Sequence, residues 1–219
     1  MKHRMIAAAA ACILCLGLSG CGHAAQTYTD YVRAVLDCTY LGDSTEYKSL
    51  TKSSETDAEA VHQEAVIYLS EQLCYQATVD RTALDADTLK GYDDLAASLI
   101  GKVKYSAADA VKAGELYQVT ITAEPLDLWD ITIGDLETCY KDKYAKAFYD
   151  EIPGTDSYKD LEATWGSQAL EIYQAHADAV TNKEPQSITT VLYVDSNGHY
   201  TMSQNEWRHI DELVFGLTK

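Results

Sequence analysis

Tyr117-Gln-Val-Thr-Ile-Thr-Ala-Glu124 is the segment at which the hydrophobic period of this chain changes. Tyr117, Val119, Ile121 and Ala123 alternate with polar residues along it. A period of two residues predicts a β-strand with one buried face and one solvated face. Because the sequence before this segment repeats with a helical period instead, the change predicts an α+β fold.

Neighbouring segments are expected to complete a small antiparallel sheet of about four strands. A partner strand begins at Val103, and the turn that joins it to the first strand falls at Lys112–Glu115. Closer to the C-terminus, the β-branched run Ile188–Asp195 is followed by Asn197-Gly198, a dipeptide typical of a type I′ hairpin turn. The return strand is then His199–Met202.

Helices are expected over most of the remaining sequence, where apolar residues recur at helical spacing between capping residues, glycines and prolines. The connection Leu126–Gly134, which contains Trp129, is expected to be non-helical. Trp165 and Trp207 are expected to be buried on the inner faces of their helices. The expected helices are Thr27–Gly42, Ser44–Leu50, one that begins at Ser54 and ends before Thr78, Leu89–Gly101, Leu136–Phe148, Tyr158–Val180, and one from Ser203 through Val214.

The sequence after residue 26 divides into two parts of similar outline. Residues 27–125 and 126–219 each contain helices followed by a hairpin, although no residue-level repeat relates them. The expected architecture is therefore one α+β domain over 27–219, with helices packed on the sheet and two helix-plus-hairpin halves as a possible subdivision.

The N-terminal segment is typical of a secretory signal. Lys2 and Arg4 precede an apolar run, Met5–Leu18, that is shorter than the roughly 20 residues needed to span a bilayer. The run ends in Leu18-Ser19-Gly20-Cys21, which resembles a bacterial lipobox. This resemblance implies that residues 1–20 are a signal peptide and that Cys21 receives a diacylglyceryl group.

An acylated Cys21 would place the protein on the membrane. Two or more acyl chains give a stable anchor, since each buried CH₂ contributes about 0.8 kcal/mol. Residues 21–26 would then form the lipidated cysteine and a short tether. We therefore expect a lipoprotein on the extracytoplasmic face of the cell membrane, with palmitate-like chains as its only membrane contact.

The formal charge of −17 bounds the possible partners. The segment up to Gly20 contributes two of the 17 basic residues and no acidic residue, so the remaining chain carries −19. Nucleic acid is excluded as a partner because its binding requires clustered Lys and Arg. Direct adsorption to anionic headgroups is disfavoured for the same reason. Such a charge favours solubility, and the alternative is binding of cations.

Three cysteines remain after Cys21, namely Cys38, Cys74 and Cys139, so at most one disulfide can form. Free, buried thiols are expected, and a disulfide scaffold is excluded. Cys12 and Cys15 belong to the apolar run of the leader and are not expected to bind metal or to act in redox chemistry.

No catalytic, metal-binding or cofactor-binding motif is present in the sequence. Asp127, Asp130 and Asp135 surround Trp129, and they could hold a cation or a sugar if the connection brought them together. The more ordinary interpretation is a solvated acidic loop.

The histidines offer equally little evidence of chemistry. His62 is expected to be a solvated helix residue, and His176 a core histidine satisfied by hydrogen bonds. An encounter of His176 with Cys139 as base and nucleophile is the catalytic alternative, although nothing in the sequence positions them. No catalytic residue, cofactor or metal is therefore predicted.

Eight segments spread over most of the chain after Cys21 form one recognisable pattern. They are Tyr31-Val-Arg-Ala-Val-Leu-Asp37, Tyr40-Leu-Gly-Asp43, Tyr47, Lys102-Val-Lys-Tyr-Ser106, Tyr117-Gln-Val-Thr-Ile-Thr122, Glu124-Pro-Leu-Asp127, Met202-Ser-x-x-x-Trp207 and Asp211-Glu-Leu213. In these segments the chain resembles uncharacterised lipoproteins of Gram-positive Firmicutes, which carry a domain of unknown function. The resemblance supports the expected location and fold and implies no activity.

The expected function is thus a non-enzymatic binding or adaptor module held at the membrane by Cys21. One alternative is a solute-binding component of a transporter, which would be favoured by two lobes with parallel sheets around a cleft. A less favoured alternative is a hydrolase without a recognisable motif, which would require a histidine and a nucleophile to converge.

Overall fold

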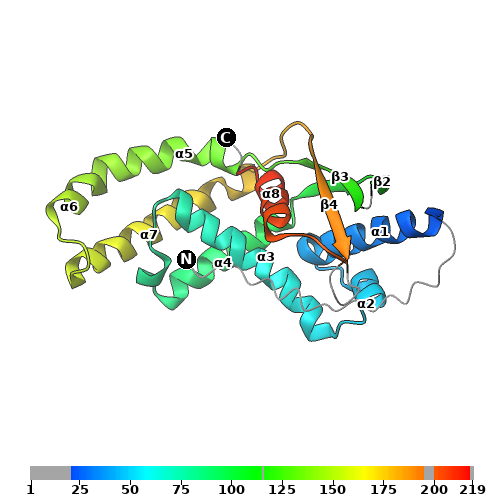
Figure 1. Ribbon diagram of the computed structural model, residues 1–219. Coiled ribbons are helices and arrows are strands. Elements are labelled where there is room, and N and C mark those ends of the chain that lie inside the picture. The colour runs from blue at the N-terminus through cyan, green and yellow to red at the C-terminus, as the bar shows by residue number, and fades with distance from the viewer. Residues whose placement is uncertain (1–20, 115, 195–199, 218–219) are drawn as a thin grey trace. The chain divides into compact units, whose positions relative to one another are not determined.

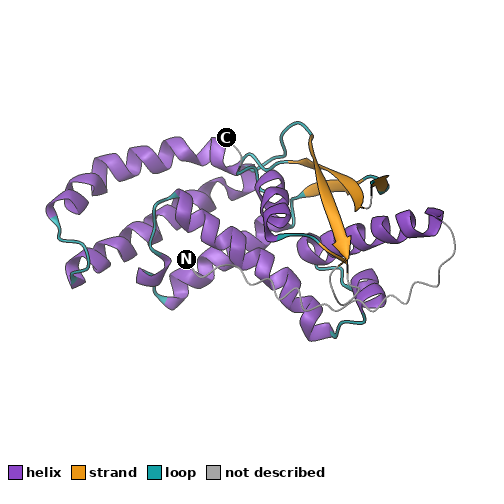
Figure 2. Ribbon diagram, viewed as in Figure 1, coloured by secondary structure: helices purple, strands orange, loops and turns teal. Residues whose placement is uncertain are grey.

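The computed structural model describes residues 21–114, 116–194 and 200–217, and the α+β class predicted from the sequence is confirmed (Figures 1 and 2). The leader and the Asn197-Gly198 turn lie outside the described residues. Within the described residues, no helix is both long enough and apolar enough to span a bilayer.

The chain folds into two compact units, each assembled from separate segments. The first, here called the sheet unit, contains residues up to 65, 103–125 and those from 183 onward. The second, here called the helical unit, contains residues 66–102 and 126–182. This division differs from the contiguous halves 27–125 and 126–219 considered above, because each unit draws segments from both halves.

All described strands belong to the sheet unit and pair antiparallel in the order β1-β3-β4-β5, with β2 also paired to β3. β1 and β2 lie end to end along one edge of β3, since β4 occupies its other edge. The sheet is therefore four positions wide, as predicted. The strands are β1 (Lys104–Ala107), β2 (Val111–Ala113), β3 (Leu116–Glu124), β4 (Gln186–Val194) and β5 (Tyr200–Thr201).

The alternation along β3 is confirmed by burial. Tyr117, Val119, Ile121 and Ala123 are buried, and the residues between them are exposed or half-exposed. The buried face is covered by α1 (Cys21–Leu36) and α8 (Gln204–Val214), which contact the strands. Figure 1 shows α8 beside β4. The opposite face of the sheet is the solvated one.

A π-helical turn, Asp37–Leu41, extends α1 and ends at Gly42, whose φ of 69° is a left-handed conformation that glycine adopts without strain. This turn buries Tyr40, whose hydroxyl donates to the buried carboxylate of Asp211 at 2.8 Å. The expected end of the first helix at Gly42 is confirmed.

The start of that helix was predicted wrongly. α1 begins at Cys21 rather than at Thr27, so residues 21–26 are helical. Asp30 accepts a hydrogen bond from the side chain of Gln26 at 2.7 Å, and Thr29 donates to the carbonyl of Ala25. The cause is local, because the alanines before Thr27 favour the helix strongly and no breaker separates them from it.

A short helix and a long one follow Gly42 in the N-terminal part of the chain. α2 spans Thr45–Thr51, and α3 spans Glu55–Gln76, passing from the sheet unit into the helical unit. Ser54 and Asp57 bond each other's backbone N–H groups reciprocally, which is the capping-box geometry that the sequence predicts here.

The helical unit is built around Trp165, which is 2% exposed, as predicted. Its indole Nε1 donates to the carbonyl of Ala77 at 2.8 Å. The hydroxyls of Tyr92 and Tyr173 donate to the carbonyls of Gly166 and Leu73. Besides the end of α3, the helices of this unit are α4 (Ala86–Ile100), α5 (Leu128–Cys139), α6 (Ala145–Asp150) and α7 (Asp156–His176).

The expected connection Leu126–Gly134 was predicted wrongly, because most of it forms α5. Isoleucines, threonine and glycine lower the intrinsic helix propensity of this segment. Packing overrides that preference, since Leu128, Thr132 and Leu136 are buried at a spacing of four residues. The hydroxyl of Thr132 remains satisfied through the carbonyl of Leu128.

The prediction that Trp207 is buried was also wrong, because this side chain is only half-buried. Trp207 lies in the first turn of α8, whereas the buried residues Ile210, Leu213 and Val214 follow it. The cap at this end of α8 was predicted correctly, since the Ser203 hydroxyl accepts a hydrogen bond from the N–H of Glu206.

Candidate functional site

The predicted lipidation site begins the described part of the chain. Cys21 is the first residue of α1, and Leu18, Ser19 and Gly20 lie outside the described residues. The proposed tether 21–26 is a helical extension of α1, which itself contacts β1 and β3. A helix rises about 1.5 Å per residue, so six residues span about 9 Å instead of the roughly 20 Å of an extended chain.

A cavity of about 660 Å³ is present in the sheet unit, between the loop after the π-helical turn and the first turns of α3. It is called the α3 cavity below. Polar side chains and small residues form its lining, and no sequence motif marks this combination. The lining residues are Gly42, Ser44, Glu55, Thr56, Ala58, Glu59, Ala60, His62 and Gln63.

His62 was predicted to be solvated, and this prediction is wrong. Its side chain is half-buried, and Nδ1 lies 3.0 Å from the carbonyl oxygen of Thr39. Since a carbonyl only accepts hydrogen bonds, Nδ1 carries the proton in the neutral ring, and Nε2 presents a lone pair. The loop packs against the ring, because a Cβ on Gly42 would lie 3.7 Å from three of its atoms.

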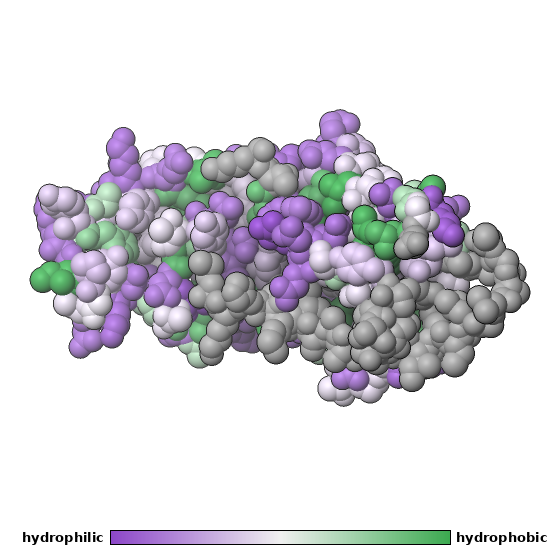
Figure 3. Space-filling view, viewed as in Figure 1, coloured by the Kyte–Doolittle hydropathy of each residue, from purple (hydrophilic) through white to green (hydrophobic). Residues whose placement is uncertain are grey.

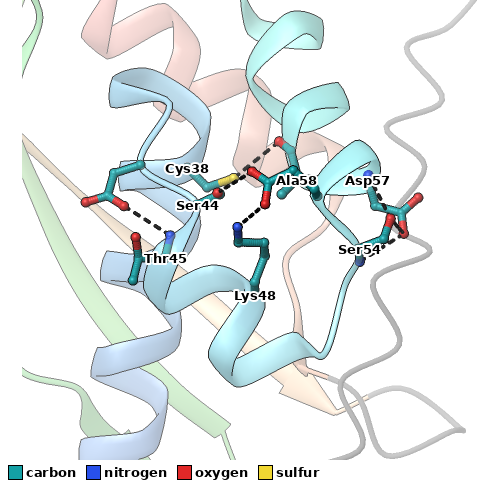
Figure 4. Close-up of polar contacts among 9 residues, drawn as sticks. Cys38, Ser44, Thr45, Lys48, Ser54, Asp57 and Ala58 are labelled. Atoms are coloured by element: carbon teal, nitrogen blue, oxygen red, sulfur yellow. Dashed lines mark hydrogen bonds and ion pairs between the residues drawn. The ribbon is translucent and has the colours of Figure 1, made fainter.

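Charged contacts hold the loop and helices beside the cavity (Figure 4). Lys48 pairs with Glu55, and this contact lowers the pKa of the Glu55 carboxyl. The Asp43 carboxylate accepts a hydrogen bond from the N–H of Thr45 at 3.0 Å, which lowers the pKa of Asp43. Both carboxyls are thus ionised at neutral pH.

The thiol nearest to this region is that of Cys38, which donates to the carbonyl of Ala58 at 3.5 Å. Burial raises the pKa of Cys38 to about 11 and that of Cys74 to about 12. Both are neutral thiols at physiological pH, whereas a catalytic cysteine reacts as the thiolate. The α3 cavity therefore offers hydrogen-bonding and charged groups for binding, but Cys38 does not supply an activated nucleophile.

Thiol reactivity tests this assignment. Cys38, Cys74 and Cys139 are free, as expected, and among these three only Cys139 is not fully buried. In protein that carries Cys21→Ser, so that position 21 adds no thiol, we expect one of the three to react rapidly with a maleimide in the native state and the other two to react only on unfolding. Mass spectrometry counts the labelled sites, and Cys139→Ser serves as the control that should remove the fast phase. Rapid labelling of Cys38 or Cys74 would contradict their burial.

The three aspartates near Trp129 do not form one site. Asp127 lies before α5 and accepts from the N–H and hydroxyl of Thr181, at 2.8 and 2.6 Å. Asp135, two turns further on, contacts His176. Among the described residues, no group of three His, Cys, Asp or Glu side chains is placed to hold a metal ion.

His176 is half-buried on α7, and its Nε2 lies 2.8 Å from an Asp135 carboxylate oxygen on α5. The prediction of a hydrogen-bonded histidine is confirmed, although the side chain lies at the edge of the core rather than within it. Its recorded partner is Asp135 and not Cys139, so the geometry provides no support for the pairing of a base with a thiol nucleophile.

Comparisons with known proteins establish a likeness of fold alone. No protein-family model matches the sequence, and no curated protein matches it. One solved structure is similar with a TM-score of 0.53 and 12% sequence identity. It is a Bacillus subtilis protein described as a "putative lipoprotein" (YcdA). The similarity covers 87% of this chain and 57% of that protein, so this chain matches little more than half of its neighbour's length.

Proposed function

We propose that this chain is a lipoprotein of the extracytoplasmic face of the cell membrane, anchored through acylated Cys21, and that it acts by binding rather than by catalysis. The observation that carries the proposal is the apolar run Met5–Leu18 followed directly by Ser19-Gly20-Cys21. The Bacillus subtilis neighbour described as a "putative lipoprotein" lends it further support.

The beginning of α1 at Cys21 adds a physical consequence. Acyl chains on this residue would continue directly from a helix that packs on β1 and β3. The sheet unit would then lie close to the bilayer surface, within about 10 Å of the acylated residue by helical rise, because no extended tether intervenes.

Binding is favoured over catalysis by the state of the reactive groups. The buried thiols of Cys38 and Cys74 are neutral, and His62 and His176 contact Thr39 and Asp135. The α3 cavity, whose lining combines polar side chains with small residues, provides a surface on which a partner or a small ligand could be held. A transporter's solute-binding component is less favoured, since the described strands form an antiparallel sheet rather than two parallel ones.

Acyl labelling tests the anchor. In cells fed an alkyne-tagged fatty acid, we expect the intact protein to incorporate the label and to partition into detergent. Cys21→Ser should abolish incorporation of the label, because it removes the thiol that forms the thioether. Cys139→Ser is the matched control and should remain labelled. Label incorporation by Cys21→Ser equal to that of the parent would contradict the anchor.

Crosslinking in intact cells tests the binding role. A photo-crosslinking residue at Gln63, which is exposed and lines the α3 cavity, should capture a specific neighbour. The same residue at Glu46, exposed on α2 outside the cavity, is the control. Identical adduct patterns at both positions would contradict a role for the cavity.

A further inference from the structure

The solvated face of the sheet differs from the rest of this acidic chain in its charge. On β3 this face presents Leu116, Gln118, Thr120, Thr122 and Glu124, which are exposed or half-exposed. The one acidic residue of the set, Glu124, pairs across the sheet with Lys104 of β1 at 3.1 Å. The described residues of this face are therefore neutral, although the whole chain carries a formal charge of −17.

Hydroxyl groups extend across the middle of this face. The Oγ1 atoms of Thr120 and Thr189 lie 3.3 Å apart, and those of Thr122 and Ser187 lie 2.7 Å apart. Each hydroxyl can donate as well as accept, so the same array can serve both sides of a symmetric contact. On the side of the molecule drawn in Figure 3, the described residues include hydrophilic side chains with apolar groups scattered among them.

The apolar part of this face lies at the β2–β3 hairpin. Val111 is 65% exposed and Leu116 is 42% exposed. They share a face because Val111 pairs with Gln118, two residues along β3 from Leu116. Exposed apolar side chains beside an uncharged polar array are typical of a surface that becomes buried in a complex.

The neighbouring edge of the sheet is already occupied. Arg33 of α1 donates to the carbonyl of Ala107 at 3.0 Å and pairs with Asp109, and the Thr29 hydroxyl accepts from the N–H of Ala110. These side chains therefore occupy the Ala107 carbonyl and the Ala110 N–H, which an added strand would need for its own backbone hydrogen bonds. Association through the β1–β2 edge is therefore disfavoured, which favours the face over this edge as a docking surface.

We propose that this face, here called the hydroxyl face, docks a second copy of the same chain. Two copies of the chain from residue 21, each with a formal charge of −19, repel each other wherever their acidic surfaces meet, and a neutral face removes that repulsion from the region of contact. A two-fold contact uses the same surface on both copies, which suits an array of groups that each donate and accept. The sheets would pack face to face.

The size of the face indicates a weak complex. The nine residues of β3 extend roughly 30 Å, and three strand positions add a width of roughly 14 Å. The pair would then bury on the order of 900 Å², at the lower limit for specific association. Such an interface suits copies that a membrane anchor already concentrates on one surface.

Sedimentation velocity of purified protein starting at position 21, with Cys21→Ser to remove the acyl site, tests the proposal. We expect monomer and dimer to be in equilibrium at protein concentrations of about 10–500 μM, because a small interface implies weak association. Raising NaCl from 50 to 500 mM should lower the dissociation constant at least about threefold, because salt screens the repulsion between the acidic copies. A protein that stays monomeric over this whole range of protein concentration, at both salt concentrations, would overturn the proposal.

Variants locate the contact. Thr120→Glu places two like charges near the two-fold axis and should raise the dissociation constant at least about tenfold. Gln174→Glu adds the same charge at an exposed position of α7, outside the hydroxyl face, and should change the dissociation constant less than about twofold. Thr120→Val should retain the dimer, and circular dichroism checks that each variant is folded. Equal dissociation constants for Thr120→Glu and Gln174→Glu would exclude this face as the interface.

Discussion

Trp165→Ala is expected to destabilise the helical unit by about 3–5 kcal/mol. Trp165 is 2% exposed, and its ring contacts Tyr140 and Tyr144 at centroid distances of 5.2 and 5.1 Å. The substitution leaves a cavity that these rings can fill only in part. It also removes the indole donor from the carbonyl of Ala77.

Urea unfolding followed by circular dichroism measures this loss. Trp165→Phe should cost less than Trp165→Ala, because the phenyl ring restores part of the packing but donates no hydrogen bond to Ala77. Tyr75→Ala is the matched control, since Tyr75 is 74% exposed, and it should change stability by less than about 0.5 kcal/mol. A loss below about 1 kcal/mol for Trp165→Ala would contradict the central place of this side chain.

Tyr40→Phe should destabilise the sheet unit by about 1–3 kcal/mol, the range for removing a hydrogen-bond partner from a buried polar group. The Tyr40 hydroxyl donates to Asp211 at 2.8 Å, and the Asp211 side chain is fully buried. The phenyl ring keeps the packing against Phe215, whose centroid lies 5.7 Å away. The loss therefore reports on the hydrogen bond rather than on a cavity.

A double-mutant cycle with Asp211→Ala, which removes the acceptor, separates the contact from other effects. We expect a coupling free energy of at least about 1 kcal/mol between the two substitutions, because each removes the same hydrogen bond. Tyr149→Phe is the control, since this residue is 89% exposed and should be neutral. Additive losses for Tyr40→Phe and Asp211→Ala would show that the hydrogen bond does not stabilise the native state.

The correct predictions concern features that depend on residues close together in the sequence, namely the buried face of a strand and the ends of helices. The alternation over Tyr117–Glu124 predicted which side of β3 is buried, because successive strand side chains point to opposite faces. Gly42 and the Ser203 cap of α8 marked helix ends correctly, because capping depends on residues a few positions apart.

The residues that line the α3 cavity could not be predicted from the spacing of neighbouring residues. His62 and Gly42 are 20 positions apart, and no periodicity relates a helix residue to the glycine of a preceding loop. Their approach depends on how the π-helical turn and α3 pack. The same limit explains why the bonds from Tyr40 to Asp211 and from His176 to Asp135 could not be foreseen.

By itself, the sequence determined the α+β class, the four-position antiparallel sheet, the buried face of β3 and most helix ends, because these follow from side-chain period and capping among near neighbours. Only the tertiary structure decided that residues 128–134 are helical, that each unit is assembled from distant segments, and which partner each buried hydroxyl and histidine contacts. The physical reason is that burial energy is gained between segments far apart in the chain, and it exceeds the small local preferences that a sequence displays.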